Sequence, residues 1–197
     1  MERPALLLAL LLAWSTQVEA QQCTAGGPGP DALWAVAPID DTQAAAPLKV
    51  MNHLRCLGCG QDLSMLLAAG PASAAFRNSP IGQKTGRAWA EAVVEDPGQR
   101  DGFLRGLLRS DTRSSPGCSL QGSVGGIVEV GELSMIRTEI HAECTPQPTL
   151  QSGEFYSGYD GRCLYQVQFV WGPGFQALSP QGHYALQSLL KSVRFRR

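Results

Sequence analysis

In the first half of the chain, apolar side chains recur at intervals of three and four residues, the spacing that places them along one face of an α-helix. The pattern covers three segments, residues 48–68, 85–95 and 99–109. Gly58 and Gly60 lie in the middle of the first segment, and glycine is a poor helix former, so we expect a break there. The front half of the chain is therefore predicted to be helical.

After Pro116 the period shortens to two, the pattern of a strand that buries one face. The alternation is regular over residues 134–144 and again over residues 161–171. Further strand signals lie at residues 122–130 and around residues 155–156. Short glycine-rich connections predict that neighbouring strands run antiparallel.

A last amphipathic helix is predicted from Ser179 or Pro180 to Val193, because a serine-proline start precedes apolar residues at helical spacing. Helices first, antiparallel strands afterwards and a closing helix indicate an α+β fold, with a helical N-terminal half packed on an antiparallel sheet. Residues 48–197 then form a single domain. Residues 21–47 are rich in Gly, Pro and Ala, which predicts a flexible lead.

The first 20 residues have the composition of a signal peptide. An apolar core from Ala5 to Trp14 spans about ten residues, far short of a membrane span. It is followed by Val18-Glu19-Ala20, whose small residues fit a signal-peptidase site. We therefore expect cleavage near Ala20 and a soluble protein that is periplasmic or secreted, with no insertion into the membrane.

Net charge argues against a nucleic-acid partner. The sequence has 16 basic and 17 acidic residues. Removal of one basic residue, Arg3, and two acidic residues, Glu2 and Glu19, leaves 15 of each, a formal charge of zero. A nucleic-acid-binding surface needs an excess of positive charge, so we expect the partner to be another protein.

All cysteines follow residue 20, and an even number in an exported chain favours disulfide bonds. Cys144 and Cys163 fall on the apolar faces of their predicted strands, so we expect both to be buried, bonded to each other or one of them to Cys118. Cys56 and Cys59 have the Cys-x-x-Cys spacing of redox proteins but follow no predicted strand, which favours an inert structural disulfide. The candidates are Cys23, Cys56, Cys59, Cys118, Cys144 and Cys163.

The charged face of the 134–144 strand is the best candidate for a binding surface. Its residues at odd positions share one side of the strand, and we add the aromatic Trp171 and the adjoining loop 172–174. His141, between two carboxylates, is also the best general base for a hydrolase. The predicted binding residues are Arg137, Glu139, His141, Glu143 and Trp171.

The sequence lacks the motifs of common catalytic sites. It has no Gly-x-Ser-x-Gly, no His-Glu-x-x-His and no Walker loop. It also has no second Cys-x-x-Cys that could complete a zinc site beside Cys56 and Cys59. We therefore expect no catalytic residue, no metal and no cofactor.

The C-terminal segment resembles a known family. The strand Leu164-Tyr165-Gln166-Val167-Gln168-Phe169, a Pro/Gly loop, Phe175 and a helix ending in residues 189–195 are similar to the closing strand and helix of PsbP-like α+β domains. The resemblance covers about 40 residues at the C-terminus. It implies an exported module that is mostly non-enzymatic in that family.

Together these features predict an exported, non-catalytic binding protein. Its forms include a bacterial periplasmic immunity protein that blocks a toxin, or an accessory factor of an envelope machine. Two alternatives remain open: a thiol-disulfide redox factor that uses Cys56 and Cys59, and a cell-envelope hydrolase.

Overall fold

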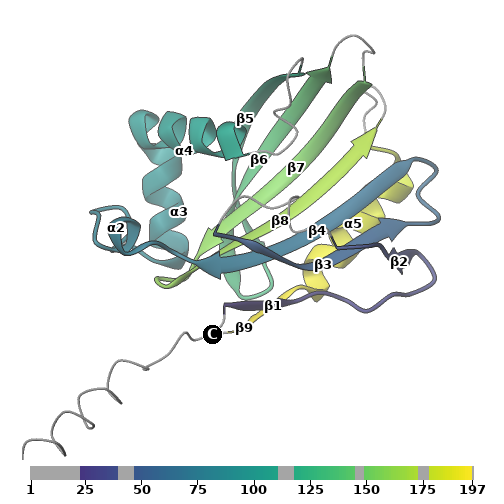
Figure 1. The fold of residues 1–197 in the computed structure, drawn as a ribbon, viewed down its shortest axis with the longest axis horizontal. Helices are drawn as coiled ribbons and strands as arrows, with labels where there is room; N and C mark the ends of the chain where they lie inside the picture. Colours follow the sequence, from purple (N-terminus) through teal and green to yellow (C-terminus); the bar gives the residue numbers. More distant parts are fainter. Residues whose placement is uncertain (1–22, 40–46, 111–117, 145–148, 173–177, 197) are drawn as a thin grey trace, which may run out of the picture.

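The protein is built on a seven-stranded antiparallel sheet (Figure 1). The structure is a computed structural model that describes residues 23–39, 47–110, 118–144, 149–172 and 178–196. Among these residues, no helix is long and apolar enough to cross a membrane.

The strands follow the spatial order β2-β3-β4-β8-β7-β6-β5. Strands β5 to β8 form a meander, and the β3-β4 hairpin joins it through antiparallel pairing of β4 with β8. Two short strands, β1 (Thr24–Gly26) and β9 (Arg194–Arg196), pair separately. The sheet strands are β2 (Trp34–Val36), β3 (Lys49–Cys56), β4 (Asp62–Pro71), β5 (Cys118–Val130), β6 (Leu133–Cys144), β7 (Thr149–Tyr159) and β8 (Cys163–Gly172).

Helices cover the two faces of the sheet in different places (Figure 1). Helices α2 (Ala74–Arg77), α3 (Gly86–Glu95) and α4 (Pro97–Ser110) follow β4 in the chain, and α3 and α4 pack over β5 and β6. Helix α5 (Pro180–Ser192) packs on the opposite face. We call these the α3/α4 face and the α5 face.

The larger core lies under α5. Leu186 and Leu189 of the helix belong to one buried cluster with Val167 and Phe169 of β8 and Met65 of β4. Full burial of each such side chain contributes about 1.5 to 3 kcal/mol, so this packing is a main source of stability. The helix begins at Pro180, and the Ser179 hydroxyl accepts a hydrogen bond from Gly182 N, as an N-cap does.

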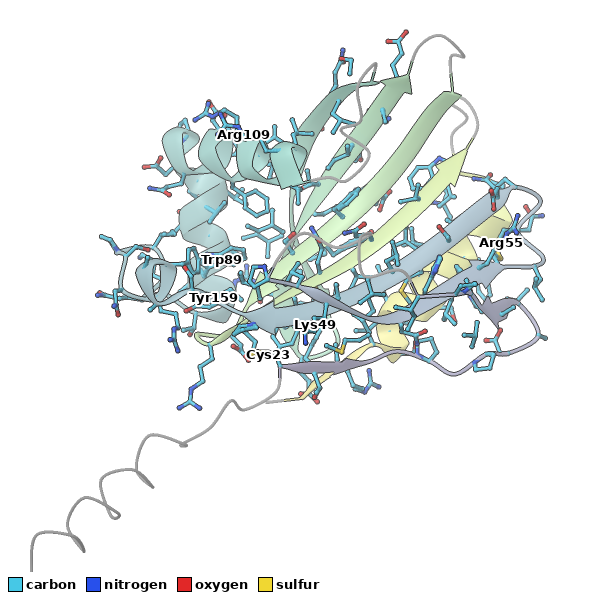
Figure 2. The ribbon with its side chains drawn as sticks, in the orientation of Figure 1. Cys23, Lys49, Arg55, Trp89, Arg109 and Tyr159 are labelled. Carbon is cyan, nitrogen blue, oxygen red and sulfur yellow. A yellow bond between two sulfur atoms is a disulfide. The ribbon has the colours of Figure 1, made fainter. Side chains whose placement is uncertain are left out.

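A smaller aromatic core lies between α3 and the sheet. Trp89 of α3 and Tyr159 of β7 make an edge-on ring contact, and Phe76 and Phe103 add edge-on contacts to these two rings. Figure 2 shows Trp89 and Tyr159 at this junction. The Tyr159 hydroxyl donates to the carbonyl oxygens of Gly82 and Gly161, so its polar end is satisfied although the residue is buried.

The predicted α+β fold with a helical N-terminal half was wrong. Residues 48–68, predicted as helix, form β3 and most of β4, and the fold is predominantly β. Strand β4 is buried on both faces, with Leu67 in the core under α5 and Leu66 in a cluster on the other face. A strand covered on both faces is apolar throughout, so its leucines fit a helical period as well as a strand. Gly60 adopts a positive φ of 70° in the β3-β4 turn.

Other predicted elements are present. Helices α3, α4 and α5 lie where helical spacing indicated, and β6 and β8 match the two alternating segments. The structure differs from the expectation for residues 21–47, because β1 and β2 lie in that segment. Residues 1–22, including the expected signal peptide and Ala20, lie outside the described residues.

Disulfides anchor the start of the described chain. Cys23 is bonded to Cys163 at the start of β8, across a separation of 140 residues. This bond rules out the predicted pairings of Cys163 with Cys144 or Cys118, although Cys163 is buried as expected. In the β5-β6 register, Cys118 lies directly opposite Cys144.

We predict that the third disulfide joins Cys118 to Cys144, because the other four cysteines are already paired and directly opposite residues meet the Cα distance limit of about 7 Å. Peptide mass mapping of the unreduced protein should recover the pairs 23–163, 56–59 and 118–144. Free thiols at both Cys118 and Cys144 would contradict the prediction.

Candidate functional site

A network of charged side chains lies on the α5 face of β6 and β7. The Arg137 guanidinium donates to both oxygens of Glu154, from Nε to Oε2 at 3.2 Å and from Nη2 to Oε1 at 2.8 Å. Nη2 also donates to Glu139 Oε1 at 2.8 Å. We call Arg137, Glu139, Glu154 and the hydroxyl of Tyr156 the charged network.

Strand register explains why these residues meet. Arg137 lies opposite Tyr156, and Glu139 lies opposite Glu154, in the β6-β7 ladder. Opposite residues share a face of the sheet and are about 5 Å apart, so all four side chains project on the same side. On this face of β6, the residue before Arg137 is Met135, which is buried in the core under α5. The network therefore begins where the apolar core ends.

Glu154 is the centre of the network. It is only 7% exposed, and a buried carboxylate is costly unless it is paired and hydrogen-bonded. Arg137 supplies two donors, and the Tyr156 hydroxyl donates to Oε2. Three donors therefore offset the loss of water around this carboxylate, and they hold Arg137 and Tyr156 in fixed positions.

The network shifts two pKa values. Burial, followed by the hydrogen bond to Glu154, raises the pKa of Tyr156 far above its ordinary value. The hydrogen bond to Glu154 also raises the pKa of Arg137, against a smaller opposing effect of burial. Both shifts favour one protonation state near neutral pH, with a neutral tyrosine and a charged arginine.

A histidine-serine contact continues this face toward the end of β6. His141 Nδ1 lies 3.1 Å from Ser152 Oγ. Ser152 is opposite His141 in the ladder and is 3% exposed, whereas His141 is half-buried. We call the surface formed by the half-buried Arg137, Glu139 and His141 and the exposed Glu143 the polar face of β6.

The structure brings four of the five predicted binding residues together. Arg137, Glu139, His141 and Glu143 lie in sequence along the polar face of β6. Trp171 lies on the same side of the sheet, opposite Ser152, but is buried in the core under α5. It therefore borders the polar face without being displayed on it. The predicted loop lies outside the described residues after Gly172.

Sequence reasoning missed the centre of the network. Glu154, Tyr156 and Ser152 alternate along β7, but only a short strand around residues 155–156 was predicted there. The alternation of Ser152, Glu154 and Tyr156 could have indicated a longer strand. Their contact with β6 could not be inferred, because it depends on the register between the two strands.

The Cys56–Cys59 disulfide braces the turn after β3. Both residues are buried, at 7% and 2% exposure. The Ser179 hydroxyl donates to Cys59 O at 2.9 Å, and Ser179 N donates to Gln61 Oε1 at 3.0 Å. The disulfide closes this turn, and the two hydrogen bonds of Ser179 hold the turn against the N-terminus of α5. Within the described part of the chain, no group of three or more His, Cys, Asp or Glu residues is placed to hold a metal ion.

We predict that Arg137→Ala destabilises the protein by about 1 to 3 kcal/mol, because it leaves Glu154 buried without its cation. Glu139→Ala is the matched control. It removes an exposed contact with the same guanidinium, so its effect should stay below about 1 kcal/mol. Chemical denaturation measures both changes, and equal small losses would show that Glu154 does not depend on Arg137.

No family model matches this chain, and no curated protein matches its sequence. Among solved structures, it is similar to LpqN, described as involved in cell envelope biogenesis of Mycobacterium tuberculosis, with 13% identity over 92% of this chain and 88% of that chain and a TM-score of 0.47. A protein from Bacteroides thetaiotaomicron VPI-5482 matches with 9% identity over 90% of this chain and a TM-score of 0.42. This chain spans half the length of that second protein. At these TM-scores, neither likeness assigns a function.

Proposed function

We propose that the chain is an exported, non-catalytic binding protein whose partner is another protein, and that the polar face of β6 is the contact surface. The two disulfides support an extracellular or periplasmic location, because cytosolic proteins seldom keep such bonds. The observation that carries the binding proposal is the charged network, which fixes an array of charges at the surface of a rigid sheet.

Rigidity favours recognition by this surface. A side chain that is already ordered loses little entropy on binding, and each rotamer-rich side chain that must be immobilised costs about 0.5 to 1.5 kcal/mol. Glu154 orders Arg137, and Arg137 in turn contacts Glu139. Both Arg137 and Glu139 remain partly exposed, so they present defined charges to a partner.

The same contacts argue against acid-base catalysis by the charged network. Glu154 accepts three hydrogen bonds from Arg137 and Tyr156, so both of its carboxylate oxygens are already engaged by donors. The raised pKa of Tyr156 keeps its proton on the hydroxyl. A general acid or base needs a pKa near the working pH, and the shift of Tyr156 moves it away from that range.

His141 and Ser152 are the observation that favours the hydrolase alternative. A serine hydroxyl within hydrogen-bond reach of a histidine is the arrangement of an activated nucleophile. Ser152, however, is 3% exposed, and a nucleophile must reach the substrate carbonyl. We therefore rank hydrolysis second, after binding.

The redox alternative requires a thiol that a substrate can reach. Cys56 and Cys59 are bonded to each other and buried at the end of β3. Burial and the contact with Ser179 support a structural role. Within the binding class, the specific forms that we propose are a bacterial periplasmic immunity protein and an accessory factor of an envelope machine.

We predict no thiol-disulfide exchange activity. Cys56→Ser should lower the melting temperature, because it releases the turn that contacts α5, and an insulin-reduction assay should show no activity in either protein. An active parent together with an inactive variant would make the redox function the leading one.

We predict that E139Q/H141N weakens partner binding without lowering the melting temperature. The two substitutions change the polar face but leave Arg137 paired with the buried Glu154. The parent and the variant are each immobilised and exposed to the extracytoplasmic fraction of the source organism, and the retained proteins are compared by mass spectrometry.

The matched control is E95Q/H183N, which changes the same residue types at exposed positions on α3 and α5. A protein held by the parent and the control but lost by the variant is the expected partner. Retention of the same proteins by all three would remove the polar face of β6 from the proposal.

A further inference from the structure

The two edge strands of the seven-stranded sheet, β2 and β5, differ in how their outward backbone groups are hydrogen-bonded. At the β2 edge, Asp31 makes two hydrogen bonds to the backbone of Trp34. Asp31 N donates to Trp34 O at 3.0 Å, and Trp34 N donates to Asp31 Oδ1 at 2.9 Å. Leu33 and Ala37 bond toward β3, so the Trp34 groups between them point outward. Asp31 therefore occupies the outward backbone groups of Trp34, which a further strand would otherwise use.

The β5 edge lacks such a closure among the described residues. Strand β5 is 13 residues long and pairs with β6, and no described strand lies on its outer side. Its sequence contains one charged residue, Glu129, and neither lysine nor proline. Natural sheets protect edges with short strands, lysine, proline or bulges, and β5 uses only a bulge, between Val124 and Gly126. Within the described ranges, no strand pairs with the outer side of the stretch before that bulge.

The side chains of this stretch define what can pair with it. Ser119, Gln121 and Ser123 are exposed on the α5 face. On the other face, Leu120 and Val124 are half-buried and alternate with them. A strand added to β5 must therefore place polar residues on one side and apolar residues on the other.

Helix α4 supports the apolar side of this edge. A Cβ at Gly122 would lie 3.1 Å from Leu104 Cδ1, so Leu104 sits directly over the middle of this stretch of β5. Leu104 and Leu108 are only half-buried in this chain. An added strand would extend the apolar surface against which these leucines pack.

We propose that β5 pairs with β5 of a second copy of this chain, antiparallel, about a two-fold axis at Gly122. Opposite residues of an antiparallel pair share a face, so an axis on a residue keeps polar residues opposite polar ones. It sets Leu120 opposite the partner's Val124, and Gln121 opposite the partner's Ser123. The sequence of β5 therefore has the alternation of polar and apolar residues that a strand paired with its own edge needs.

Charge and symmetry agree with this pairing. No charged residue lies between Cys118 and Val128, so the two copies meet without like charges opposite each other. A two-fold axis perpendicular to the sheet keeps both copies of α4 on the same side, where Leu104 of each lies near the new strand pair. The result is a continuous sheet through the dimer. This inference does not rest on the proposed function, because it uses the edge of β5 and not the polar face of β6.

Sedimentation velocity of the full exported protein tests the pairing. The parent should sediment as a dimer that dissociates on dilution. Q121K/S123K places lysines opposite each other twice at exposed positions and should weaken the dimer about tenfold or more, with an unchanged melting temperature. Q121K/S123E sets opposite charges at the same contacts and should remain dimeric.

The control is Q181K/Q187K, which adds the same charge at exposed positions on α5 and should remain dimeric. Hydrogen exchange of the parent gives a second measurement that needs no variant: the amides of residues 119–124 that point away from β6 should become protected as concentration rises, while those of 34–36 do not change. A parent that is monomeric at all concentrations overturns the proposal, as does a Q121K/S123K protein that stays dimeric or a Q121K/S123E protein that does not.

Discussion

The fold depends on the antiparallel pairing of β4 with β8 at the centre of the sheet. This ladder runs from Asp62 opposite Gly172 to Pro71 opposite Cys163 and joins two parts of the chain about a hundred residues apart. It places Leu67 of β4 beside Val167 of β8 on the surface that α5 covers. Without it the β3-β4 hairpin would have no sheet to join, and α5 would have half of its core.

The extent of α5 also decides where the candidate site lies. The helix ends at Ser192, and the buried Val193 after it belongs to the same core as Leu133 and Met135 at the start of β6. From Arg137 onward, the same side of β6 carries polar and charged residues. The buried core under α5 and the candidate binding surface therefore occupy successive parts of one strand face. Glu154 lies where the apolar core meets the polar residues. Arg137 compensates the buried charge of Glu154, and Glu154 in turn holds Arg137 in place.

The two proposed contact surfaces are neighbours in the sheet and depend on different kinds of interaction. The polar face of β6 would recognise a partner through charges ordered by Glu154, whereas the β5 edge would recognise a second copy through backbone hydrogen bonds and side-chain alternation. Charges set specificity and association rate, and strand pairing sets geometry. At the other edge of the sheet, Asp31 already bonds the outward backbone groups of Trp34, which leaves less of that edge available for a further strand.

The sequence by itself determined the elements whose periodicity is local: α3, α4 and α5, and the alternating strands β6 and β8. It also placed Arg137, Glu139, His141 and Glu143 on one side of β6, since that requires only a period of two. Tertiary structure decided the rest. Residues 48–68 form strands. Because both faces of β4 are covered, this segment lacks the alternation of polar and apolar residues that indicates a strand. The partner of Cys163 and the position of Glu154 depend on strand order and register, and contacts between distant segments leave no periodic trace in the sequence.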